Sequence, residues 1–238
     1  MLLIKWLCVH LIGDFLLQSN SMVRHKKRLK ARSWMLYVHC LLHGALIYLV
    51  TTQWQNWLIP ATVVVTHFVI DLWKLHKHDK AIFFIADQSL HFLVLVILWV
   101  ATHPDQARLV DMFTFAWGHM PGWSILLGYL LMLWPGGIMI GYLTQRWRND
   151  INDQLEQTQR SLAEAGKWIG MFERVLVYTF IITQQYAGIG FLITAKSILR
   201  FSETKKETGR KEAEYILIGT LISFSFAILT GLLILLII

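Results

Sequence analysis

Four apolar segments in the first hundred residues each carry two side chains that can bind a metal ion, spaced four positions apart. The segments read HLIGD, HCLLH, HFVID and DQSLH, and they contribute the pairs His10 and Asp14, His39 and His43, His67 and Asp71, and Asp87 and His91. On an α-helix this spacing puts both members of a pair on one face, one turn apart. Imidazole nitrogens and carboxylate oxygens are common ligands of zinc and other divalent transition metals.

The elements that must position these pairs are transmembrane helices. The chain has 238 residues, of which 55% are hydrophobic, and its mean hydropathy is +0.50. Several segments are long and apolar enough to cross a hydrocarbon core of about 30 Å. The sequence therefore predicts an all-α, polytopic transmembrane helix bundle, with full spans at approximately 2–19, 34–52, 57–75, 82–102, 122–144 and 214–238.

Basic residues alternate along the connecting segments and predict the orientation. The 51–57 link carries no charge and the 102–121 link has one arginine, whereas the other links are basic. By the positive-inside rule the basic links are cytoplasmic, and the N-terminus starts on the outer side. The most basic link, between the first two spans, contains Arg24, Lys26, Lys27, Arg28, Lys30 and Arg32.

Residues 172–200 allow two topologies. Two apolar halves flank a polar, glycine-bearing centre at 184–188, and halves of about a dozen residues suit a re-entrant hairpin buried in protein. A single crossing would give seven spans but would place the basic residues 205–211 outside, against the charge rule. We favour six full spans and a re-entrant hairpin.

Counting inward from the cytoplasmic helix ends places the eight residues in two layers. The reversed order of the fourth pair compensates for the reversed direction of its helix, and helix bundles build metal sites from such facing side chains. The deeper layer is predicted to contain His10, His43, His67 and His91, and the shallower layer Asp14, His39, Asp71 and Asp87.

A single intramembrane histidine usually makes a packing hydrogen bond, but eight residues in register favour a metal. Three buried carboxylates need a cation or protons to offset their charge. The set could hold one ion with neighbours that orient its ligands, or two ions about 3.5–4 Å apart, and eight candidates favour two. Zinc is the first choice, with manganese and iron as alternatives. A proton relay would not need this register, and haem would need histidine pairs separated in depth.

Weaker candidates lie around this set. Gln18 and Gln88 could hydrogen-bond a substrate or cap locally. The segment Trp134–Gly137 predicts a kink that lets another helix approach. Residues 145–171 predict a cytoplasmic helical linker whose helix ends near Gly166, which separates residues 1–102 and 103–144 from residues 172–238. Basic residues that could bind a phosphate or phospholipid head group, or simply lie at the membrane surface, are Arg174, Lys196 and Arg200.

The motifs HLIGDFLLQ, HFVIDLWK and DQSLH resemble a family of bacterial membrane proteins, domain of unknown function 3307, over residues 3–100. The block GIGFLITAKSILRF, followed by EAEYILIGTLISF, is similar to longer members of that family. The resemblance implies a location in the bacterial inner membrane. A looser similarity, to predicted membrane-bound metal-dependent hydrolases, is an analogy and does not establish an activity.

The leading hypothesis is a metal-dependent hydrolase that cleaves a phospholipid or another lipid-linked phosphate from the cytoplasmic leaflet. A bound divalent ion makes hydroxide available near neutral pH, and the catalytic candidates are Asp14, Asp71 and Asp87, as ligands or as general base. The alternatives are a divalent-metal transporter or sensor, and a structural membrane subunit stapled by metal. The net charge of +7 reflects basic cytoplasmic links, so membrane lipid rather than nucleic acid is the expected partner. Oligomerisation is left open.

Overall fold

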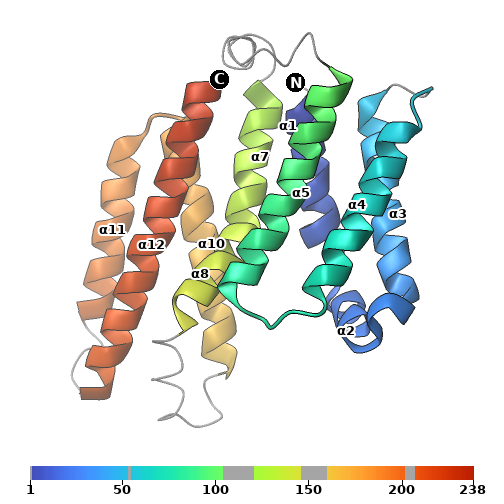
Figure 1. The fold of residues 1–238 in the computed structure, drawn as a ribbon. Helices are drawn as coiled ribbons and strands as arrows, with labels where there is room; N and C mark the ends of the chain where they lie inside the picture. Colours follow the sequence, from blue (N-terminus) through green and yellow to red (C-terminus); the bar gives the residue numbers. More distant parts are fainter. Residues whose placement is uncertain (1, 53–54, 104–120, 146–159, 202–206) are drawn as a thin grey trace. The chain divides into compact units, whose positions relative to one another are not determined.

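The computed structural model describes residues 2–52, 55–103, 121–145, 160–201 and 207–238, and Figure 1 shows its fold. Every regular element in these ranges is helical, which confirms the predicted all-α class. Four segments are long and apolar enough to span a membrane, namely Trp34–Thr51, Ala81–Thr102, Gly122–Leu143 and Ile216–Ile237. These lengths make the chain a membrane-protein candidate, whereas the count of six spans stays a prediction.

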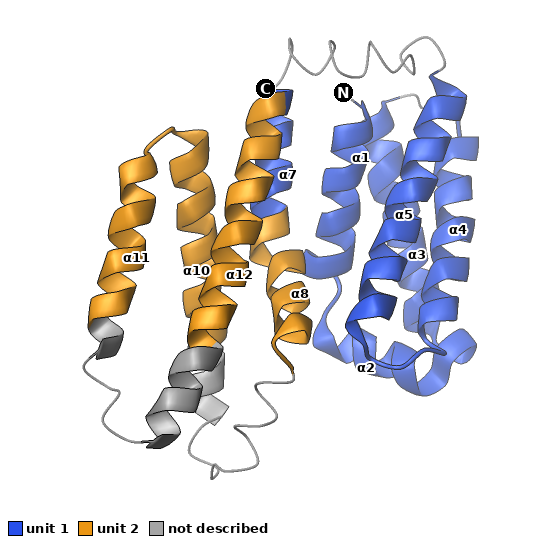
Figure 2. Ribbon diagram, turned by 60° about the vertical axis from the view of Figure 1, so that its left-hand side comes forward, with its two compact units in different colours: residues 1–130, 237–238 blue, residues 131–236 orange. Residues whose placement is uncertain are grey.

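The chain divides into two compact units, drawn in different colours in Figure 2. Unit 1 comprises residues 1–130 and 237–238, and unit 2 comprises residues 131–236. Unit 1 is built around four helices that run alternately up and down (Figure 1): α1 (Leu2–Leu11), α3 (Trp34–Thr51), α4 (Leu58–Lys74) and α5 (Ala81–Thr102).

The first helix does not continue as a regular α-helix. A π-helical turn at Ile12–Leu16 follows α1, and Leu17 N donates to Ile12 O at 2.9 Å. The chain then bends by 82° into α2 (Asn20–Leu29), which Ser19 caps by accepting a hydrogen bond from Met22 N. This basic segment was expected to be a plain connecting link, but a serine cap followed by helix-forming Lys and Arg residues suffices to start a helix here.

Helices α3 and α4 pack closely because of a glycine at their crossing. A Cβ atom on Gly44 would lie 2.4 Å from Val64 Cγ2, so no larger residue fits without a shift. Toward the N-terminal end of α4, an apolar core separates the polar pairs from the opposite end of the bundle. Its buried members, contributed by all four helices, are Trp6, Val9, Ile47, Ile59, Val63, Leu95 and Trp99.

The predicted kink of the fifth span is present. Helix α7 (Pro121–Leu133) ends before Trp134, and α8 (Pro135–Leu143) begins with the proline that has no N–H to continue the helix. In unit 2, a Cβ on Gly136 would lie 2.7 Å from the ring of Phe226 on α12 (Glu207–Ile237), which fits the expected close approach of another helix. Arg174 Nε donates to the Met132 carbonyl at 2.9 Å and so satisfies a backbone group released by the break.

The prediction that the helix of the linker ends near Gly166 is wrong, since α10 runs over Arg160–Ile182. A single glycine costs a helix only about 1 kcal/mol, and the apolar segment that follows Gly166 continues the helix. Residues 146–159 of the linker lie outside the described residues.

Helix α11 (Tyr186–Phe201) returns alongside α10 (Figures 1 and 2), after a turn in which Gln184 has φ 58°. The hairpin arrangement is therefore present within unit 2.

Candidate metal centre

All eight His and Asp residues selected from the sequence meet inside the four-helix bundle of unit 1. Seven are buried, and Asp14 keeps 10% of its side chain exposed. They form three overlapping groups whose ligand atoms lie within 4.8 Å of one another. The groups are His10, Asp14, His43 and His67; His39, His67 and Asp71; and Asp71, Asp87 and His91.

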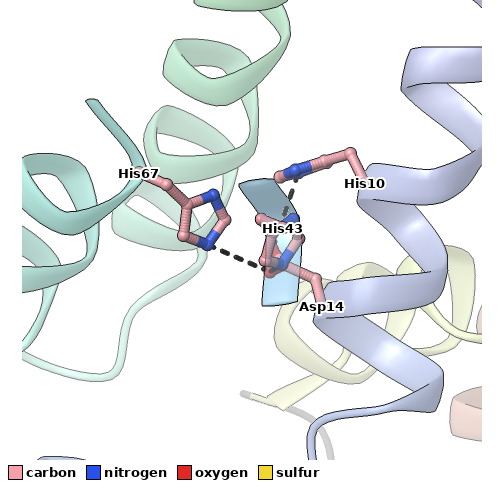
Figure 3. Close-up of side chains that lie close together, drawn as sticks. All are labelled: His10, Asp14, His43 and His67. Carbon is pink, nitrogen blue, oxygen red and sulfur yellow. Dashed lines mark ion pairs between the residues drawn. The ribbon is translucent and has the colours of Figure 1, made fainter. Parts of the chain in front are cut away.

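The first group, which we call site A, surrounds the Asp14 carboxylate (Figure 3). Asp14 Oδ1 lies 3.1 Å from His43 Nε2 and 3.5 Å from His67 Nε2, and Asp14 Oδ2 lies 3.6 Å from His10 Nε2. Although these atoms are close, Asp14 Oδ1, His10 Nε2 and His43 Nε2 make no hydrogen bond to any described residue. Buried polar atoms of this kind normally have partners, so their joint lack of one needs an explanation.

The separations in site A match those of ligands around one small cation. With metal–ligand bonds of about 2.0–2.2 Å, two ligands of a tetrahedral ion lie about 3.4 Å apart. The three distances to Asp14, from 3.1 to 3.6 Å, bracket this value. Site A can therefore hold one divalent ion through three imidazoles and one carboxylate.

The π-helical turn positions Asp14 in site A. The spacing of His10 and Asp14 predicts a regular α-helix between them, whereas Asp14 lies in the middle of the π turn. Turns of this kind are rare and are frequent at functional sites. Gly13, in the same turn, lies directly against the imidazole of His43: a Cβ there would be 2.5 Å from His43 Cε1. The local backbone is thus adapted to the histidine that faces it.

The predicted layers are recognisable but merge at Asp14. In the deeper layer the ring centroids of His43 and His67 lie 3.9 Å apart, and those of His67 and His91 lie 4.1 Å apart. His39, assigned to the shallower layer, lies 3.2 Å from Asp14 Oδ1 through Nε2 and 3.1 Å from His67 Nε2. Asp14 thus contacts histidines of both layers.

The third group, which we call site B, consists of Asp71, Asp87 and His91. His91 Nε2 lies 3.7 Å from Asp71 Oδ1 and 3.6 Å from Asp87 Oδ1. The second oxygen of each carboxylate is taken by a lysine: Lys26 Nζ lies 2.6 Å from Asp71 Oδ2, and Lys74 Nζ donates to Asp87 Oδ2. Site B therefore carries its own positive charges, which site A lacks.

Sequence reasoning missed both lysines because it counted them only as basic residues of cytoplasmic links. Lys26 is 5% exposed although it lies in the run HKKR, and its neighbour Lys27 pairs with exposed Asp79. A signal existed for Lys74, which lies three residues after Asp71 on the same helix face. No comparable signal distinguishes Lys26 from Lys27, since the direction of α2 depends on the bend before it.

The two glutamines proposed as substrate ligands contact the centre itself. Gln18 Nε2 lies 2.9 Å from His39 Nε2. Gln88 Nε2 donates to Asp14 Oδ2 at 3.0 Å and to Asp87 Oδ2 at 3.1 Å, and so links site A to site B. Both amides therefore orient His and Asp side chains in this structure.

The basic residues proposed for a phosphate group belong to unit 2. Arg174 is 5% exposed and caps the Met132 carbonyl, and Lys196 Nζ lies 2.7 Å from Glu173 Oε2. The side chain of Arg200 lies outside the described residues. Arg174 and Lys196 thus have partners in their own unit.

The comparisons with known proteins agree with the N-terminal motifs. The family model described as "Protein of unknown function (DUF3307)" matches residues 2–119. The chain therefore belongs to this family through that region, which contains all eight His and Asp residues. No curated protein and no solved structure matches the chain.

Proposed function

We propose that this protein is a membrane-embedded, metal-dependent hydrolase that acts on a phospholipid or another lipid-linked phosphate. The observation that carries the proposal is site A, where Asp14 Oδ1 and the Nε2 atoms of His10 and His43 are buried, close together and without hydrogen-bond partners. A divalent ion would satisfy all three atoms at once. Zinc fits three imidazoles and a carboxylate best, with manganese and iron as alternatives.

The residues around the ion supply the further requirements of hydrolysis. With four protein ligands around it, the ion would need a fifth coordination position for a water, whose pKa it would lower so that hydroxide is available near neutral pH. Asp14 is proposed as a ligand, and Asp71 and Asp87 as the candidates for ligand or general base. Gln88 holds Asp14 and Asp87 at fixed separation through its two hydrogen bonds. Fixed positions of this kind are what a reacting group needs.

A second candidate function is a divalent-metal transporter or sensor, and a third is a structural subunit stapled by metal. The packing around the centre favours an enzyme over a transporter. One turn beyond the histidines, toward the end of the bundle away from α2, the described core residues Trp6, Ile47, Val63 and Leu95 are apolar. A transported ion would have to cross this layer without ligands, at a high cost in hydration energy.

For the topology we propose six spans in the bacterial inner membrane, formed by α1, α3, α4, α5, α7 with α8, and α12. The helices α10 and α11 would form a re-entrant hairpin, and the main basic links would be cytoplasmic. Labelling of a Lys205→Cys variant by an impermeant thiol reagent tests this topology. Labelling only from the cytoplasmic side agrees with it, whereas labelling from the outside supports seven spans.

Metal content is the first test of the site. The detergent-purified protein, prepared without chelators, is expected to carry zinc, manganese or iron in inductively coupled plasma mass spectrometry. His43→Ala should lose the ion, because His43 is a ligand of site A, whereas His103→Ala should keep it, because His103 packs against Trp6 outside the cluster. Equal metal content in all three proteins would refute the site.

Activity separates the three candidate functions. The metal-loaded protein in mixed micelles is expected to release phosphate, or a phosphorylated head group, from lipid phosphates. Loss of this activity in the Asp14→Asn variant would attribute it to site A. Metal uptake into proteoliposomes without hydrolysis would support a transporter, and a bound metal with neither activity would support a structural role.

A further inference from the structure

Site B contains the complete set of side chains for a second cation but also two lysines. Its His91 Nε2 and Asp87 Oδ1 are buried and make no hydrogen bond within the described residues. Their separation of 3.6 Å resembles the ligand separations of site A. The lysines bind the Oδ2 atoms of Asp71 and Asp87, so the Oδ1 atoms of both carboxylates still face His91.

The two sites differ in charge. In site B the two carboxylates are balanced by Lys26 and Lys74, and the sum is zero. Site A contains Asp14, which pairs with no lysine of the described residues. A dication in site A would leave the centre with one net positive charge. A second dication would then enter a buried site that already repels it, and such repulsion is weakly screened there.

We propose that Lys26 and Lys74 act as tethered cations that keep site B closed to a second divalent ion. The resting protein then holds one ion, in site A, and site B becomes a second metal site when the lysine charges are withdrawn. This inference rests on the proposed metal site A. It replaces the expectation of two resident ions, which counted ligands without counting lysines.

The lysines are not equivalent, because they come from different elements. Lys26 has 6% of its side chain exposed and reaches Asp71 from α2, the helix that follows the 82° bend. Lys74 lies at the end of α4 with 38% of its side chain exposed. Water screens an exposed charge more than a buried one, so Lys26 should contribute more to the exclusion of the second ion.

Zinc titration of the full-length protein in detergent tests the proposal. The metal-stripped wild-type protein should bind one equivalent, and the variant carrying both Lys26→Gln and Lys74→Gln should bind two. Lys26→Gln alone should tighten the second equivalent by about tenfold or more, and Lys74→Gln by less. Lys27→Gln is the matched control, since it removes the same charge from the same helix but from an exposed pair with Asp79, and it should bind one equivalent.

The outcomes separate this inference from the proposed function. Wild-type protein that binds no zinc would overturn both. One equivalent in both the wild type and the double variant would overturn the tethered-cation inference alone, as would two equivalents in the wild type. If the double variant does not fold, the single variants carry the test. A second equivalent that binds no more tightly to Lys26→Gln than to Lys27→Gln would then overturn the inference.

Discussion

Sites A and B are built from the same residue types on the same four helices, yet they satisfy their buried charges in different ways. Site B pairs each carboxylate with a lysine, while the described residues around Asp14 in site A are histidines and the neutral amide of Gln88. A buried ion pair can satisfy its charges without any ligand, although its net stabilisation is small. A buried carboxylate without a counter-ion needs a proton or a cation to offset its charge, and the proposed ion of site A would supply it. The number of ions expected in the cluster therefore depends on the lysines as well as on the number of ligands.

The largest expected effect is the loss of the ion from site A. Asp14→Asn keeps the size of the side chain but removes its negative charge, and so the ion bound in site A should be lost completely. Metal content by mass spectrometry is the measurement. Asp79→Asn, which alters an exposed carboxylate paired with Lys27, should keep the full content. Retained metal in the Asp14 variant would mean that site A is not the binding site.

The next effect concerns stability at site B. Lys26→Met leaves Asp71 buried without its counter-ion, and breaking a buried pair costs about 3–5 kcal/mol. Chemical unfolding of the metal-stripped protein in detergent should show this loss of free energy of unfolding. Lys27→Met, in an exposed pair, should change the free energy little. Excess zinc should stabilise the Lys26 variant more than it stabilises the wild type, in which only site A takes the ion; equal stabilisation of the two proteins would argue against an ion in site B.

A smaller effect is expected from the backbone of the π turn. Gly13→Ala would place a Cβ 2.6 Å from His43 Nε2, and the imidazole must move to accept it. Displacing a ligand through its surroundings typically lowers metal affinity about 10–100-fold. Competition with a fluorescent chelator measures the change. Gly190→Ala, where a Cβ would meet no atom within 4 Å, serves as the control and should have the wild-type affinity.

The smallest effect is expected in unit 2, where Lys196 and Glu173 pair with each other. Lys196→Gln breaks the pair with Glu173, in which the side chains are 25% and 13% exposed, and should lower stability by at most about 1 kcal/mol. Metal content should not change. A loss of metal would show that unit 2 contributes to the centre, and a loss of lipid-phosphate turnover alone would support the substrate-binding role considered for Lys196.

The sequence predicted most of the candidate site because its signals are periodic and local. Spacing of four residues on apolar helices placed each pair on one face, and helix direction placed the four pairs at one depth. Prolines and glycines predicted the break before Pro135, since a missing N–H interrupts any helix. The continuation of α10 through Gly166 was missed because a single glycine is a weak helix breaker.

By itself, then, the sequence determined that the chain is helical, that it is apolar enough for a membrane, and that eight His and Asp residues share a bundle interior. The tertiary structure alone decided how their charges are balanced. Lys26 and Lys27 are chemically identical neighbours, and only the bend after the π turn directs one to Asp71 and the other to exposed Asp79. The same turn brings Asp14 among four histidines. Such long-range directions depend on packing between elements, which no local spacing encodes.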